Sequence, residues 1–400
     1  MLAMKETTTT KTVLSFERPG KIYSNSILRV ARHFWNVRQN ALVLNLADEL
    51  LRHPEIPVVG VIDEERKVVG IVRRDRFFAQ VSKPFGREVL RRSTVAEVTD
   101  TCESIDANSD IFAVAQRVLK NTNDDDSAYY PLHDETGKCM GLFSVQDISN
   151  YLSKITRDDI ELAGRLQERL LASNELSEGD GWRIDAWSRA AKGVGGDFYF
   201  SSEFEDGKIF TALCDVSGKG VAASLIVSMV WGMLRMYDFR GGLSDLIVQL
   251  NRSIITTFHM EKYLTGFFMI YDPLTMRIDC ADMGHSHIVL IREGKVHHIR
   301  GKTLNLPIGV ETVITPAVDT FRLRKGDALL VHSDGITEQE NANGEEFGEP
   351  RLSRTVIHAL TSNTPLQEEV PVAVDAFRGS APQQDDMSCV LLDLGVKVPE

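Results

Sequence analysis

The stretch KIFTALCDVSGKGVAA, residues 208–223, decides how the second half of the chain is read. Its apolar and β-branched residues predict a strand from Lys208 to Asp215, and a helix is expected from about Gly220 to Tyr237. Asp215 therefore stands at the end of a strand, next to a turn that contains glycine. This is a position from which a carboxylate can take part in a binding site.

Three further aspartate motifs lie in the same half of the chain. They are Gly195-Gly196-Asp197, Ser333-Asp334-Gly335 and Asp385-Asp386, and each adjoins a β-like apolar run. Strand ends from distant sequence can bring carboxylates together, and clustered carboxylates repel each other unless cations lie between them. Hard cations such as Mg²⁺ prefer carboxylates, carbonyls and water as ligands. The four motifs together predict a hard-metal site.

Strand-like runs fill much of residues 181–400. They cover 183–190, 197–204, 208–215, 264–272, 277–282, 287–292 and 328–333, and a second helix is expected at 243–258. Strands and helices do not alternate strictly, which disfavours a Rossmann-type domain. The pattern favours an α+β sandwich of antiparallel strands with long helices between distant pairs.

The composition is that of a soluble globular protein with two or three domains. Its formal net charge of −12 disfavours general nucleic-acid binding. The five cysteines form no Cys-x-x-Cys pair, and no apolar stretch is long enough to cross a bilayer. We therefore expect a cytoplasmic protein that binds neither nucleic acid nor membrane. Residues 1–24 carry no signal peptide and are expected to be disordered or extended.

The first 150 residues contain an internal repeat. Strand-like runs at 56–62 and 68–72 form one copy, and runs at 130–133 and 139–143 form the other. In each copy the two runs enclose an acidic turn, follow a helix-like segment and precede a polar helix start. The repeat predicts two βαββα-type motifs within residues 25–153.

This repeat resembles a pair of CBS motifs. In that family two motifs pack together and often bind an adenine nucleotide, whose ribose is held by a Ser/Thr-x-x-Asp sequence. Ser144-Val145-Gln146-Asp147 matches it in the second copy, whereas Val72-Arg73-Arg74-Asp75 in the first copy lacks the hydroxyl. The resemblance implies a regulatory domain with a nucleotide site at Ser144 and Asp147. The alternative is that Ser144 only caps the next helix.

A helical linker is expected over residues 154–180. From Gln146 to Ser173 the chain contains no proline, and apolar residues recur at spacings near 3.5. This pattern favours a short coiled coil that joins two domains in a homodimer. The alternative is a helix packed on the surface of one domain. A polar, glycine-containing break at 174–181 then marks the start of the last domain, residues 181–400.

The aspartate motifs and the landmarks between them resemble the PPM-type metal-dependent protein serine/threonine phosphatases of the bacterial SpoIIE/RsbU-like branch. The resemblance runs from about Leu162 to Leu394 with the motifs in order. The matching segments are 193–199, 215–223, 283–286, 306–309, 333–338 with 347–348, and 385–388. It implies an α-β-β-α sandwich of two antiparallel sheets flanked by helices.

The resemblance also implies roles for single residues. Asp215 would bridge two Mn²⁺ or Mg²⁺ ions, Asp197 and the carbonyl of Val216 would serve one ion, and Asp334 and Asp385 would complete the other. A metal-activated water would then attack the phosphorus directly. Asp386 would support the ligands, although an exchange of roles with Asp385 stays open.

This chain departs from the family at Phe200. The family often reads Gly-Gly-Asp-x-Tyr-Asp, so a carboxylate is missing here, while the four main ligands remain. No arginine is obvious for gripping phosphate, and Lys192 is the residue we can suggest. His285 and His287 have no cysteine or carboxylate at ligand spacing, so we expect a structural role for them rather than zinc binding.

We therefore expect a protein phosphatase regulated by its CBS pair. The resemblance implies that its substrate is a phosphoprotein, a phosphorylated STAS-type anti-sigma-factor antagonist. The competing hypothesis is a non-catalytic scaffold that senses a nucleotide and switches a partner. The intact aspartates disfavour this alternative, and Phe200 leaves it open.

Overall fold

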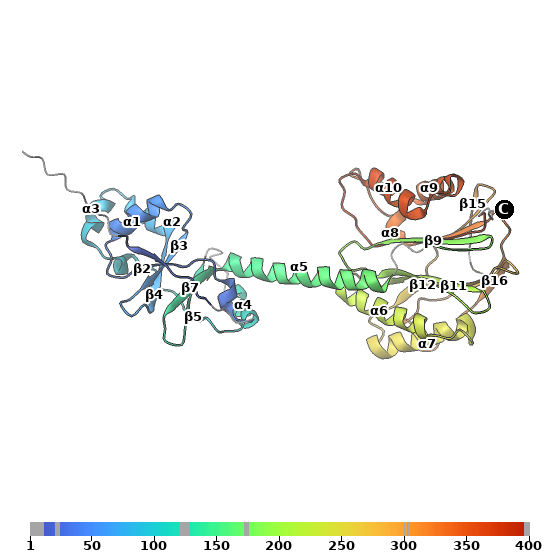
Figure 1. Cartoon of the computed structure of the whole chain (residues 1–400), viewed down its shortest axis with the longest axis horizontal. Helices are drawn as coiled ribbons and strands as arrows, with labels where there is room; N and C mark the ends of the chain where they lie inside the picture. The colour runs from blue at the N-terminus through green and yellow to red at the C-terminus, as the bar shows by residue number, and fades with distance from the viewer. Residues whose placement is uncertain are drawn as a thin grey trace, which may run out of the picture. The chain divides into compact units, whose positions relative to one another are not determined.

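The computed structural model describes residues 12–20, 25–120, 128–171, 176–299, 301 and 304–395. The chain divides into two compact units, Met1–Arg157 and Asp158–Glu400, which follow each other from blue to red in Figure 1. Among the helices of the described residues, none is long and apolar enough to cross a membrane.

The N-terminal unit is built from two small sheets and short helices. The first sheet has the order β1 (Leu14–Phe16), β2 (Trp35–Arg38), β3 (Val58–Ile62) and β4 (Val68–Arg73), and the second has β5 (Ile105–Asp106), β6 (Tyr129–His133) and β7 (Cys139–Ser144). The α-helices are α1 (Val43–Arg52), α2 (Arg74–Val81), α3 (Gly86–Val89) and α4 (Ile111–Lys120), with 3-10 turns at Ile27–Val30, Leu90–Arg92 and Val95–Val98.

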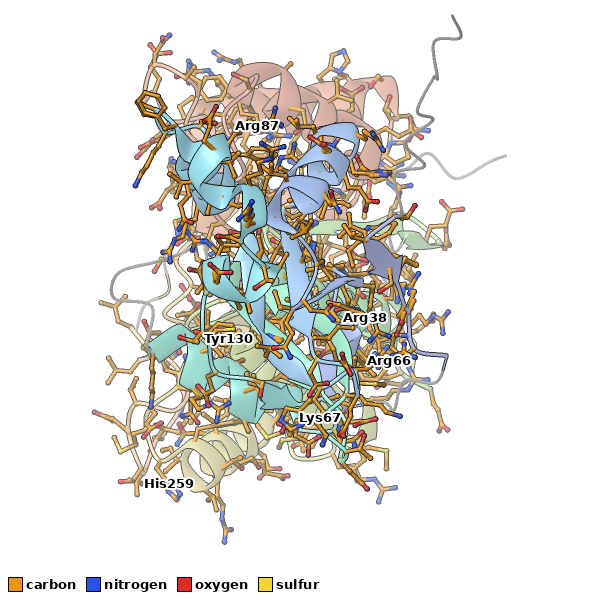
Figure 2. All side chains as sticks on the ribbon, turned by 90° about the vertical axis from the view of Figure 1, so that its left-hand side faces the viewer. Arg38, Arg66, Lys67, Arg87, Tyr130 and His259 are labelled. Atoms are coloured by element: carbon orange, nitrogen blue, oxygen red, sulfur yellow. The ribbon has the colours of Figure 1, made fainter. Side chains whose placement is uncertain are left out.

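The two copies of the sequence repeat share one topology. In the first, β2 runs parallel to β3 and β3 antiparallel to β4, while in the second β5 runs parallel to β6 and β6 antiparallel to β7. The turns between the paired strands of the two copies also meet. Val68 N donates to Gly137 O at 3.1 Å, and Cys139 N donates to Arg66 O at 3.0 Å. Figure 2 labels Arg66 and Lys67 in the first of these turns.

The structure refines the expectation for the N-terminus. Within residues 1–24, Leu14–Phe16 form strand β1, which pairs antiparallel with β2. Both oxygens of the Glu49 carboxylate accept hydrogen bonds there, one from Val13 N at 2.9 Å and one from Leu14 N at 2.8 Å. Residues 1–11 and 21–24 lie outside the described part of the chain.

The linker differs from the helix expected over residues 154–180. Helix α5 (Val145–Leu170) begins inside the first unit and ends inside the second. Strand β8 (Leu176–Gly179) follows it and pairs antiparallel with β9 (Trp182–Arg189). The polar sequence of this segment predicts a break. The structure instead has an edge strand, which backbone pairing holds in place without apolar side chains on both faces.

The C-terminal unit contains two antiparallel sheets. One has the order β10-β11-β12-β13-β16, and the other has the order β15-β14-β17-β18-β9-β8. The remaining strands are β10 (Asp197–Glu203), β11 (Ile209–Val216), β12 (Leu264–Asp272), β13 (Arg277–Met283), β14 (Ile288–Arg292), β15 (Lys295–His298), β16 (Asp319–Arg322), β17 (Ala328–His332) and β18 (Met387–Asp393). The helices are α6 (Val221–Met236), α7 (Gly242–Phe258), α8 (Asp334–Thr337), α9 (Glu349–Ser362) and α10 (Leu366–Arg378).

Three apolar cores hold this unit together in four layers. The middle core lies between the sheets and includes Leu213 and Val390, one core joins the five-stranded sheet to α6 and α7, and the third joins the six-stranded sheet to α9 and α10. Figure 1 shows these helices on the outer faces of the two sheets. The predicted α-β-β-α sandwich is therefore confirmed for the C-terminal part of the chain.

Candidate active site

The alternation of side chains along two neighbouring strands places Asp197 and Asp215 together. Phe198 of β10 and Cys214 of β11 belong to the core beneath α6 and α7, so the adjacent aspartates face the space between the sheets. Asp197 and Asp215 are also directly opposite each other in the β10–β11 register. Two carboxylates so placed repel each other unless a proton or a cation lies between them.

The second sheet brings Asp334 and Asp385 to the same end of the sandwich. Asp334 begins α8 directly after β17, Asp385 and Asp386 precede β18, and these two strands pair with each other. A Cβ atom on Gly335 would overlap the carbonyl oxygen of Asp386. Only glycine permits this close approach of the two backbones, which is the physical reason for the Asp334-Gly335 motif.

Asp386 links the two sheets. Its carboxylate accepts hydrogen bonds from Ala191 N at 2.7 Å and from Gly196 N at 2.6 Å, and the residue is buried. Both oxygens are thus occupied by the backbone that leads to Asp197. Asp385 instead lines the cavity described next, and Asp386 does not.

A cavity of about 290 Å³ lies at this end of the sandwich. Asp215, Val216, Asp334 and Asp385 are among the residues that line it. Asp197 lies deeper: it is buried, and its Oδ2 atom has no hydrogen-bond partner within the described residues. The structure therefore gathers four of the five predicted metal ligands around one cavity, and the fifth, Asp197, is buried opposite Asp215 in the β10–β11 pairing.

The electrostatics of these carboxylates fit a cation. Burial, and then the charges of Asp334, Asp385 and Asp386, raise the pKa of Asp215 to about 7. Burial, and then the charge of Asp215, raise the pKa of Asp197 well above its ordinary value. Within the described residues, no three His, Cys, Asp or Glu side chains are already arranged as a metal-binding group. The crowding of negative charge and the unpartnered Asp197 oxygen nevertheless suit the oxygen-ligand chemistry of a hard divalent ion.

Lys219 is a residue of the site that the sequence reading missed. Its Nζ atom lies 2.7 Å from Asp385 Oδ2 and donates to Gln384 O at 3.0 Å, and the side chain lines the cavity. Lys192, the residue that the sequence offers for phosphate binding, is exposed and does not line this cavity. The available signal was the position of Lys219 inside the second aspartate motif.

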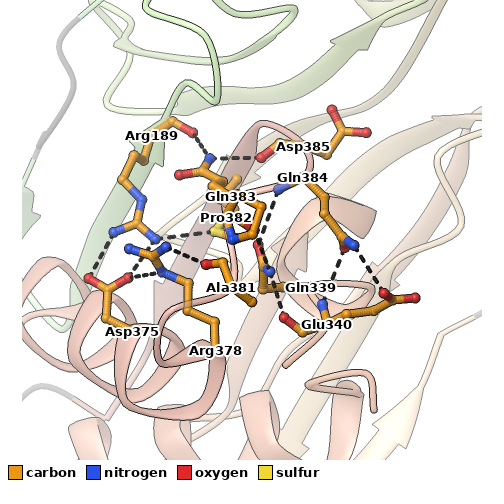
Figure 3. A network of polar contacts seen from close by, with 11 residues as sticks. Arg189, Gln339, Glu340, Asp375, Arg378, Ala381, Pro382, Gln383, Gln384 and Asp385 are labelled. Atoms are coloured by element: carbon orange, nitrogen blue, oxygen red, sulfur yellow. Dashed lines mark hydrogen bonds and ion pairs between the residues drawn. The ribbon is translucent and has the colours of Figure 1, made fainter. Parts of the chain in front are cut away.

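The loop that carries Asp385 is fixed by glutamine side chains, as Figure 3 shows. Gln383 Nε2 donates to Asp385 O at 2.7 Å and to Arg189 O at 3.0 Å. Gln339 Nε2 donates to Pro382 O at 3.1 Å. These contacts fix the backbone of the loop and leave the Asp385 carboxylate facing the cavity.

His285 and His287 also line the cavity. His285 Nε2 lies 2.9 Å from His332 O, the arrangement of an N–H donating to a carbonyl. Burial lowers the pKa of His285 to about 3 and that of His332 to about 4, so both are neutral at pH 7. These contacts give His285 and His287 a place in the cavity wall.

Phe200 belongs to the core instead of the site. It is buried, and its ring centroid lies 6.0 Å from those of Phe210 and Trp231. The carboxylate that the family often has here is thus replaced by aromatic packing beneath α6.

The structure places Ser144 and Asp147 in the N-terminal unit, at the start of α5. Asp147 Oδ2 accepts from Ser144 N at 2.8 Å and from Ser144 Oγ at 2.7 Å, and Asp147 N donates to Ser144 Oγ at 3.1 Å. His33 Nε2 lies 3.4 Å from the same carboxylate. This reciprocal pattern is a capping box at the start of α5.

Comparison with known proteins finds similarity in the C-terminal unit. Residues 205–395, just under half of the chain, match the family model described as Stage II sporulation protein E (SpoIIE). The matched range contains Asp215, Asp334 and Asp385 but starts after Asp197, which joins the site through its pairing with Asp215.

Two curated relatives and one solved structure are similar to this chain. Protein IcfG of Synechocystis sp. is 22% identical over 264 residues, which cover 59% of this chain and 41% of the relative. Phosphoserine phosphatase RsbU of Bacillus subtilis is 27% identical over 191 residues, which cover 47% of this chain and 56% of the relative. The solved SiaA-PP2C domain of Pseudomonas aeruginosa is 18% identical, with a TM-score of 0.49, and covers 60% of this chain and 98% of that domain. The chain thus spans about half the length of the curated relatives it matches.

The four-layer sandwich with acidic strand ends from both sheets is the architecture that the resemblance to PPM-type phosphatases predicts. The C-terminal unit is similar to the SpoIIE family model and to the relative named phosphoserine phosphatase RsbU. The matched range does not include the N-terminal unit.

Proposed function

We propose that this chain is a metal-dependent protein serine/threonine phosphatase that hydrolyses a phosphoprotein. The observation that carries the proposal is a single cavity lined by Asp215, Asp334 and Asp385, which come from two sheets of a domain that matches the SpoIIE family model. With the buried Asp197, these are the residues to which we assign catalysis.

Two Mn²⁺ or Mg²⁺ ions are the proposed cofactors. Asp197 and the Val216 carbonyl would hold one ion, Asp334 and Asp385 would hold the other, and Asp215 would contact both. When bound, such a pair supplies an activated water and neutralises the charge of the phosphate. Other side chains would bind the substrate phosphate and orient the metal ligands.

Two of these supporting side chains are visible in the structure. Asp386 fixes the Gly196 peptide and with it the direction of Asp197. Lys219 brings an ammonium group to the cavity, and we assign to it the contact with the substrate phosphate.

The proposed substrate is phosphoserine or phosphothreonine in a partner protein. Similarity to a relative named phosphoserine phosphatase RsbU supports this class of substrate. The resemblance to the SpoIIE/RsbU-like branch favours a STAS-type anti-sigma-factor antagonist as the partner.

We further propose that the N-terminal unit is a regulatory CBS pair. Its two copies with one topology support this assignment, and an adenine nucleotide would bind at Ser144 and Asp147. The proposed homodimer would form through α5, where Leu162 and Leu166 are 49% and 57% exposed. Apolar side chains four residues apart on a helix face suit packing against a second helix.

Hydrolysis of p-nitrophenyl phosphate by the full chain tests the catalytic proposal. Activity should require Mn²⁺ or Mg²⁺ and should be lost in Asp215→Asn and Asp334→Asn. Full activity without metal would exclude the proposed mechanism. Absence of Mn²⁺ uptake in calorimetric titration would instead favour the non-catalytic scaffold. A phospho-STAS protein, assayed with and without ATP, ADP or AMP, tests the partner and the regulation.

A further inference from the structure

The last two turns of α5 lie against the loop that leads to Asp197. Gln167 is 9% exposed there, whereas its neighbours Glu168 and Arg169 on the same helix are exposed. A buried glutamine amide needs hydrogen-bond partners, because leaving its donor or acceptor unpaired away from water is costly.

Gln167 finds both partners on one backbone residue. Its Nε2 donates to Gly195 O at 2.8 Å, and its Oε1 accepts from Gly195 N at 3.0 Å. The side-chain amide therefore pairs with the Gly195 peptide groups as a neighbouring strand would. The two atoms together fix the position and the orientation of Gly195.

A second contact between the same helix and loop is independent of Gln167. Gly164 lies one turn earlier on the same face of α5, and a Cβ atom there would overlap the carbonyl oxygen of Gly193. Helix and loop thus approach each other as closely as their backbones allow, which gives the pairing at Gly195 little freedom to adjust.

The loop between Ala190 and Asp197 is consequently held from two sides. Gln167 fixes Gly195, and the Asp386 carboxylate fixes the next peptide at Gly196. Asp197 follows directly, so the backbone that carries its carboxylate is held by both contacts.

We propose that Gln167 is a positioning residue for the metal site: it ties the end of α5 to Asp197 through Gly195. The proposal rests on the proposed function in taking Asp197 as a metal ligand. It makes the C-terminal turns of α5 part of the machinery that sets metal affinity, although no residue of α5 lines the cavity.

The test replaces Gln167 by methionine in the full chain, which keeps the length of the side chain and removes both hydrogen bonds. Arg165→Met, on an exposed position of the same helix, is the matched control. Calorimetry should show about tenfold weaker Mn²⁺ binding for Gln167→Met only, because a loop freed from both hydrogen bonds must be ordered again when the ion binds. Hydrogen exchange should be faster at residues 195–198, while the melting curve of the control stays that of the parent protein.

Gly164→Ala perturbs the same contact with Gln167 intact. Alanine favours the helix itself, so weaker Mn²⁺ binding in this variant points to the helix–loop contact and not to a damaged helix. Parental Mn²⁺ affinity and parental exchange at 195–198 in both variants would overturn the proposal. If the parent protein binds Mn²⁺ but does not hydrolyse phosphate esters, the proposed function fails. The Mn²⁺ affinities and the exchange rates would still test whether Gln167 positions the metal site.

Discussion

Replacing Gly335 by alanine should misplace Asp334 without altering any predicted metal ligand. The new Cβ would overlap the carbonyl oxygen of Asp386 and would lie 3.1 Å from the Cβ of Asp385. Neither neighbour is the end of a flexible side chain, so the start of α8 must move away from the loop before β18. A displacement of about 1 Å at a catalytic constellation costs about 100-fold in rate.

The assay is steady-state hydrolysis of p-nitrophenyl phosphate at saturating Mn²⁺, and we expect kcat/KM to fall by about 100-fold. Gly232→Ala is the matched control, because nothing lies within 4 Å of a Cβ at this position of α6. This control should keep parental activity. Unchanged activity in Gly335→Ala, with cooperative unfolding retained, would refute the inference that close backbone approach positions Asp334 beside Asp385.

Three further predictions concern stability and metal. Arg183 and Asp393 form a buried ion pair at 3.1 Å, so Arg183→Ala should lower the free energy of unfolding by about 3–5 kcal/mol in urea denaturation, and Asp393→Ala should add little to this loss. Hydrogen bonds from Arg189 and Arg378 lower the pKa of Asp375, so the carboxylate stabilises the fold above the pKa of the unfolded chain and loses this effect as pH falls through the lowered folded value. The difference in melting temperature between the parent protein and Asp375→Asn should therefore be constant near neutral pH and shrink below about pH 4. Chelation with EDTA should abolish phosphatase activity and lower the melting temperature, and added Mn²⁺ should restore both, because a bound ion stabilises the folded state.

The sequence predicted those parts of the fold that follow from side-chain periodicity. The continuous apolar run of β11 and the long apolar helices predicted the sandwich, because elements buried in a core leave runs of apolar residues. Strand β8 was missed since backbone pairing with β9 defines it, and its polar residues carry no such pattern. Local sequence thus predicts elements that bury a face, and it is silent on elements that only complete an edge.

The residues of the candidate site also fall into those that local sequence predicts and those that it does not. Motifs beside glycine identified Asp215 and Asp334, whose positions depend on local turns. The different directions of the Asp385 and Asp386 carboxylates depend on backbone donors that are distant in sequence. Gly196, which donates to Asp386, is 190 residues away. Gln167 is likewise defined by a partner 28 residues ahead. Contacts of this kind become visible only once the chain has folded.

Because Phe200 packs against aromatic rings, a single substitution cannot restore the aspartate of the motif that this segment resembles. A carboxylate introduced by Phe200→Asp would replace the ring that packs on Phe210 and Trp231 beneath α6. An unpaired charge in such surroundings costs several kcal/mol, so a single reversion would harm the fold before it could assist the site. To accept an aspartate at this position, the chain would first need substitutions in the core under α6. Phe210 and Trp231, which pack on Phe200, do not line the proposed active-site cavity.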